Sequence, residues 1–82
     1  MVVIHRAHGF RFVIYTADHE PAHIHITGAG HAKVDLAGPD GRPAAVFVVG
    51  ITRGDMIRLL AEVELRQAEF LRAWRRIHGP YH

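Results

Sequence analysis

Apolar and polar residues alternate along most of the first half of the chain. Apolar side chains occupy every second position in three segments, the clearest being Phe10, Phe12 and Ile14, and mostly polar side chains lie between them. A period of two is typical of a β-strand with one buried face. Glycine- and proline-containing clusters separate the segments, as expected for turns. The pattern predicts strands over residues 2–6, 10–16, 22–27, 31–37 and 44–49.

The fifth predicted strand differs from the others. Residues 44–49 read Ala-Ala-Val-Phe-Val-Val and are apolar throughout. A continuous apolar run of this length is typical of a strand that is covered on both faces. We therefore expect both faces of this strand to be buried.

The last third of the chain has a helical period. Apolar residues recur three or four positions apart from Met56 to Ile77, which indicates one amphipathic helix over residues 53–78. About 26 residues is long for a helix in a small domain, and a bend near Glu64 would shorten it.

Signals at both ends delimit this helix. Thr52 and Asp55 have the spacing of a capping box, and Gly79 and Pro80 form a stop signal. The whole pattern predicts one α+β domain over residues 1–82. About five antiparallel strands form one sheet, and one long C-terminal amphipathic helix packs on it.

Composition narrows the class of protein. The chain has 82 residues, a formal net charge of +2 and no cysteine, so disulfides and thiolate metal sites are excluded. A domain this small must be stabilised by packing alone, by oligomerising, for example as a homodimer, or by a histidine and carboxylate metal site. Neither a signal peptide nor a membrane span is evident, and we expect a cytoplasmic protein of bacterial type that does not bind membranes.

A histidine cluster is the strongest chemical signal. Residues 18–25 read Asp-His-Glu-Pro-Ala-His-Ile-His and contain His19, His23 and His25, three of the eight histidines in the chain. Imidazole is the side chain whose ordinary pKa lies near neutrality. Such a cluster points to metal binding, acid–base catalysis or phosphate contact.

The register of the hairpin at residues 22–37 decides which groups join this cluster. Centring its turn on Ala29 places all apolar positions on one face, and a shift of one residue would mix both faces. In this register His23 lies opposite Asp35, His25 lies opposite Lys33, and His31 is a diagonal neighbour of His25. Directly opposed Cβ atoms are about 4.5–5.5 Å apart.

The first interpretation of this face is a metal site. His23 and His25 are two residues apart on one strand and aim two imidazoles at one point, and His19 supplies a third ligand. Asp35 is a fourth ligand or a hydrogen-bonding partner of a ligand. Without cysteine, the metal would be zinc, nickel, copper or iron.

The second interpretation is metal-free cleavage of RNA. His23 and His25 act as base and acid, and Asp35 orients His23. Lys33 and Arg11 hold the phosphate. The candidates are His19, His23, His25, Lys33 and Asp35 as catalytic residues, and Arg11 and His31 as substrate-binding residues. The third interpretation is a solvent-facing sheet face that happens to be rich in histidine.

These segments together resemble the DUF4160 family of small bacterial proteins of unknown function. Its signature combines an aromatic N-terminal hairpin, an acidic-His-x-Pro-Pro-His-Val-His-Val motif and a helix that ends in Leu-x-x-Trp. The matching segments here are residues 9–12, 18–26, 32–33 and 70–74. The resemblance spans nearly the whole chain, and Ala22 stands where the family has a second proline.

The resemblance implies a partner and a role. Members are commonly encoded beside a second small protein, and the pairs look like toxin–antitoxin modules. The leading hypothesis is therefore a toxin, acting on RNA as a ribonuclease or phosphodiesterase, with an antitoxin-like protein as its partner. The alternative is a non-catalytic module that uses the three histidines to bind a transition metal such as zinc, or to bind a partner.

Overall fold

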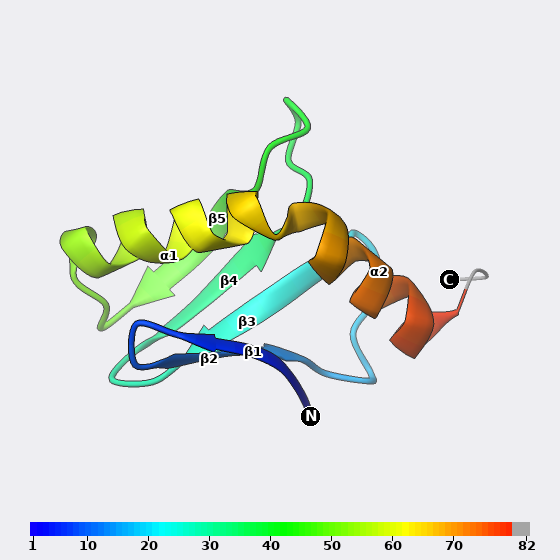
Figure 1. The fold of residues 1–82 in the computed structure, drawn as a ribbon, viewed down its shortest axis with the longest axis horizontal. Helices are drawn as coiled ribbons and strands as arrows, with labels where there is room; N and C mark the ends of the chain where they lie inside the picture. The colour runs from blue at the N-terminus through cyan, green and yellow to red at the C-terminus, as the bar shows by residue number, and fades with distance from the viewer. Residues whose placement is uncertain (80–82) are drawn as a thin grey trace.

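The computed structural model describes residues 1–79, which form one antiparallel sheet and two helices (Figure 1). The five strands lie side by side in sequence order. The strands are β1 (Val2–Ala7), β2 (Phe10–Ile14), β3 (His23–Thr27), β4 (His31–Asp35) and β5 (Ala44–Val49), and the helices are α1 (Arg53–Leu65) and α2 (Gln67–His78). The predicted α+β class and the five antiparallel strands are confirmed.

The core lies between the sheet and the two helices, which run along the same side of it (Figure 1). Alternate strand residues such as Phe12, Ile24 and Ile26 are fully buried there. The helical part of the core consists of Met56, Leu59, Val63, Phe70, Ala73 and Trp74. Each large apolar side chain buried in this way contributes roughly 1.5–3 kcal/mol.

The register of the β3–β4 hairpin is the predicted one. His23 pairs with Asp35 and His25 pairs with Lys33, while Ile24, Ile26 and their partners face the core. Burial of the apolar positions selects this register, because a shift of one residue would turn them toward solvent.

The single long helix predicted from the periodicity is wrong, because the chain forms two helices. Arg66 separates them with φ −107° and ψ 17°, two residues beyond the bend considered at Glu64. A straight helix over residues 53–78 would be about 39 Å long, whereas the molecule is 36 Å in its longest dimension. The break lets both halves pack on the sheet. Gln67 holds the junction by donating hydrogen bonds to the carbonyl oxygens of Leu36 and Gly41.

The start of α1 follows its sequence signal. The hydroxyl of Thr52 accepts a hydrogen bond from the backbone N–H of Asp55 at 3.1 Å, as expected for a capping residue. Gly79 ends α2 with φ 76°, whereas Pro80 lies outside the described residues. No helix among residues 1–79 is both long enough and apolar enough to cross a membrane.

The expectation that the fifth strand is covered on both faces is wrong. Among residues 1–79, β5 is an edge strand that pairs with β4 alone, and its residues Val46, Phe47, Val48 and Val49 are 40–64% exposed. Hydrophobicity alone does not report strand order, so an apolar run fits an edge strand as well as a central one.

Candidate functional site

Along each strand, the positions between the core residues point to the other face of the sheet, and most of them are polar. From β3 and β4 this open face receives His23, His25, Thr27, His31, Lys33 and Asp35. Arg11 and Val13 of β2 extend it, because they pair with Thr27 and His25. Side chains at alternate positions of neighbouring strands share a face, so these residues lie on the side of the sheet away from the core.

Three side chains converge at one end of this face. One carboxylate oxygen of Asp18, Oδ2, lies 3.2 Å from Nε2 of His23 and 3.8 Å from Nε2 of His25. The possible ligand atoms of the three residues all lie within 4.8 Å of one another. Their side chains are only 6–18% exposed. A carboxylate and two imidazoles are therefore aimed at one small, largely enclosed volume.

A tight turn after β2 holds the carboxylate in place. The backbone N–H of Asp18 donates to the carbonyl oxygen of Tyr15 at 3.1 Å, and the N–H of Tyr15 donates to Oδ2 of Asp18 at 3.2 Å. Aspartate favours such turns because its short side chain can bond to nearby backbone. The turn ends β2 at Ile14, two residues earlier than predicted, and directs the carboxylate toward β3.

The ring of His23 is oriented by a backbone carbonyl, which turns Nε2 toward Asp18. Its Nδ1 lies 2.9 Å from the carbonyl oxygen of Pro21. A carbonyl only accepts hydrogen bonds, so Nδ1 carries a proton. In a neutral ring Nε2 would then present its lone pair to the Asp18 oxygen. A proton shared between the two residues, or a metal ion between them, makes this contact favourable.

Trp74 of α2 packs against the ring of His23, so α2 covers this end of the face. The His23 ring is 5% exposed, and its centroid lies 5.2 Å from that of Trp74. The indole N–H of Trp74 donates to a carboxylate oxygen of Glu20 at 3.4 Å, which links α2 to the loop that carries the histidine motif. Trp74 thus contacts both His23 and Glu20 in the loop before it, and holds them together.

The surroundings of His25 favour the neutral form of its imidazole. Burial lowers the pKa of its imidazole, and the nearby His23, His31 and Lys33 act in the same direction, whereas Asp18 opposes them. Its Nδ1 lies 3.1 Å from Nε2 of His31. Nε2 of His25 faces Asp18, and a neutral imidazole is the form that ligates metals.

Several predicted site residues lie where the register placed them. Lys33 is opposite His25, and His31 is a diagonal neighbour whose ring contacts His25 at a centroid distance of 5.3 Å. Arg11 lies on the same open face and is exposed.

Two other predicted residues do not reach the cluster. His19 is exposed and makes no hydrogen bond, ion pair or ring contact within residues 1–79. Asp35 pairs with His23 in the register, but the two ring nitrogens of His23 face Pro21 and Asp18 instead. The expected orienting contact between Asp35 and His23 is therefore not formed.

Asp18 takes the place that the sequence pattern assigned to Asp35 and His19. It belongs to the histidine motif, but it precedes the strand and has no register position, so the pairing argument does not assign it to the site. Its signal is local. An aspartate three residues after a strand-end tyrosine has the spacing of a side-chain-to-backbone turn.

The fold and the cluster define a class of protein. It is a small α+β domain whose sheet has one face under two helices and one open, histidine-lined face. The family model DUF4160, a domain of unknown function, matches residues 9–75, and the chain belongs to this family. The matched range includes all three converging residues. No curated protein and no solved structure shows significant similarity to the chain.

Proposed function

We propose that this protein binds a transition-metal ion through Asp18, His23 and His25, and that the bound ion is its functional centre. The observation that carries the proposal is the convergence of Nε2 of His23 and Nε2 of His25 on one oxygen of Asp18. Ligand atoms about 2.0–2.1 Å from a tetrahedral ion are about 3.3 Å apart. The distances of 3.2 and 3.8 Å are close to this spacing.

The hydrogen bonds around the imidazoles support the same proposal. Histidines that ligate metals usually donate their other N–H to a carbonyl, a carboxylate or water. His23 donates Nδ1–H to the carbonyl of Pro21, and Nδ1 of His25 pairs with His31. Both rings therefore use Nδ1 for these contacts and turn Nε2 toward Asp18, where an ion would lie. A metal ion between Nε2 of His23 and the Asp18 carboxylate would make their contact favourable.

The ligand set indicates what kind of metal centre this would be. Three protein ligands leave at least one coordination position open, which is typical of catalytic rather than structural zinc. Two histidines and one carboxylate are also the set used by non-haem iron enzymes. Such an ion could activate a water molecule or polarise a substrate oxygen.

Acid–base catalysis by the pair His23 and His25 fits the geometry less well. A general acid and a general base must reach opposite sides of the scissile phosphate. Here both Nε2 atoms face one carboxylate oxygen, and these three atoms lie within 4.8 Å of one another. That spacing suits a bound ion better than a phosphate between two imidazoles.

The metal proposal makes a direct prediction about stability. Protein stripped with EDTA should unfold at a higher temperature after addition of Zn²⁺, because an ion that binds only the folded state stabilises it by about 2.7 kcal/mol at one hundred times its dissociation constant. Thermal unfolding followed by circular dichroism measures the shift. Replacing Asp18 with Asn should remove most of it. An unchanged unfolding temperature with zinc, iron, nickel and copper would contradict the proposal.

A second candidate function is the ribonuclease toxin of a toxin–antitoxin pair. Lys33 opposite His25 and His31 bonded to it favour this role, because they place a fixed cation and a second imidazole beside the centre. We expect expression without the neighbouring gene product to stop bacterial growth, and His25→Ala to restore it. Growth rate after induction is the measurement. Normal growth with the wild-type protein would exclude the toxin role.

A further inference from the structure

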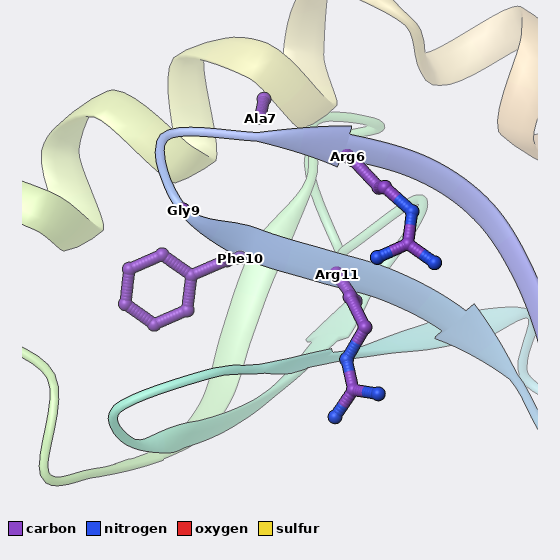
Figure 2. Close-up of a pocket in the computed structure, with 5 residues that line it drawn as sticks. All are labelled: Arg6, Ala7, Gly9, Phe10 and Arg11. Atoms are coloured by element: carbon purple, nitrogen blue, oxygen red, sulfur yellow. The ribbon is translucent and has the colours of Figure 1, made fainter.

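Two arginines lie side by side on the first hairpin. Arg6 of β1 and Arg11 of β2 are register partners, and both are exposed. Figure 2 shows their side chains leaving the hairpin on the same side, with Ala7 on the other side toward α1. The two arginines, with Ala7, Gly9 and Phe10, line a pocket of about 400 Å³. The hairpin therefore presents two neighbouring guanidinium groups on one side.

Neither guanidinium group has a counter-ion among the described residues. The side chains of Arg6 and Arg11 make no hydrogen bond or ion pair with any of residues 1–79. Like charges directly opposite each other on neighbouring strands are destabilising. An anion between the two side chains would remove this cost, and two arginine forks match the oxygens of a phosphate.

The arginine pair continues as a row across the sheet. Arg11 pairs with Thr27, and Thr27 pairs with His31. The hydroxyl of Thr27 is buried and has no hydrogen-bond partner among residues 1–79. This row lies two residues along β3 from His25, which corresponds to about 6.6 Å. It therefore runs beside the cluster formed by Asp18, His23 and His25.

An exposed aromatic ring lies beside the β4 end of this row, where Phe47 pairs with Lys33 and is a diagonal neighbour of His31. The ring of Phe47 is 40% exposed and lies 5.3 Å from that of His31, and His31 in turn contacts His25. Positive charges that follow a backbone, combined with exposed rings on which bases can stack, are the features of surfaces that bind single-stranded nucleic acid. A phosphorylated peptide would use the arginines but would leave the rings without a role.

We infer that the open face binds single-stranded nucleic acid, with Arg6 and Arg11 on one backbone phosphate and Phe47 beneath a base. This inference deepens the proposed function by naming its substrate class. It rests on that function in one respect: the phosphate next to the one held by Arg6 and Arg11 would lie at the metal centre. The phosphate contact itself needs no metal ion.

The test is binding of a fluorescent oligouridylate of about 12 nucleotides, and of the matching oligothymidylate, at several salt concentrations. The double variant Arg6→Gln/Arg11→Gln should bind both about tenfold more weakly at low salt. The slope of log affinity against log salt should fall by about 0.7 for each phosphate that the variant no longer neutralises. The matched control is Arg72→Gln/Arg75→Gln, which removes the same charge from exposed positions on α2.

The outcomes separate this inference from the metal proposal. Wild-type affinity in the Arg6/Arg11 variant, or an equal loss in the α2 control, would overturn the inference. Phe47→Leu should weaken binding with little change in the salt slope, because a stacking contact releases no counter-ions. If the EDTA-stripped protein binds the oligonucleotides and no ion is ever retained, the inference stands and the metal proposal fails.

Discussion

Alanine in place of His23 is expected to weaken Zn²⁺ binding by about 100-fold or more. Loss of an outer hydrogen-bonding partner of a metal ligand costs 10–100-fold in affinity, and loss of the ligand itself should cost at least as much. His23 is the best anchored of the three residues, since Pro21 fixes its ring and Trp74 covers it. Competition with a fluorescent chelator measures the affinity of each variant.

His19→Ala is the matched control for this experiment. It removes an imidazole from the same motif, but His19 is exposed and lies outside the converging group. We expect its zinc affinity to be that of the wild type. Because His23 is buried, circular dichroism must show that His23→Ala is folded, and His25→Ala provides a second ligand variant. Equal losses in His19→Ala and the two ligand variants would contradict the site.

Alanine in place of Phe70 is expected to destabilise the fold by about 3–5 kcal/mol. Phe70 is fully buried, and its ring lies 5.8 Å from the rings of both Phe12 and His5. It therefore joins α2 to the first two strands. Stability in domains is typically only about 5–15 kcal/mol, so the variant should lose much of it. Urea unfolding measures the change.

Leu65→Ala is the control for the core variant. Leu65 is 78% exposed, so its truncation should change the free energy of unfolding by no more than about 0.5 kcal/mol. A loss of several kcal/mol in Leu65→Ala, or none in Phe70→Ala, would show that α2 does not pack as described.

The register of the site hairpin could be predicted because burial permits only one solution. Ile24, Ile26, Ala32 and Val34 all reach the core in a single pairing. That pairing also determines which polar residues share the open face. The positions of Lys33 and His31 beside His25 therefore follow from the sequence alone.

The composition of the cluster could not be predicted in the same way. A period of two says nothing about a loop, and the position of Asp18 depends on its hydrogen bonds to Tyr15. Asp35 is the register partner of His23, but register pairing does not determine the direction in which the imidazole ring points. The anchor at Pro21 turns the His23 imidazole toward Asp18.

The two errors in the predicted fold have a common origin. Exposure of β5 and the break at Arg66 depend on the order of the strands and on the length of the sheet. Both are properties of the assembled molecule. Local hydrophobic periodicity gives the buried side of an element, but it does not give the position of that element relative to the edge of the sheet.

The most direct test of the metal centre is elemental analysis of the protein purified without a histidine tag. We predict about one transition-metal ion per chain in the wild type and in His19→Ala. We predict almost none in variants that lack Asp18, His23 or His25. A wild-type protein that contains no metal, and that takes up none on dialysis against zinc, iron, nickel or copper, would contradict the central proposal.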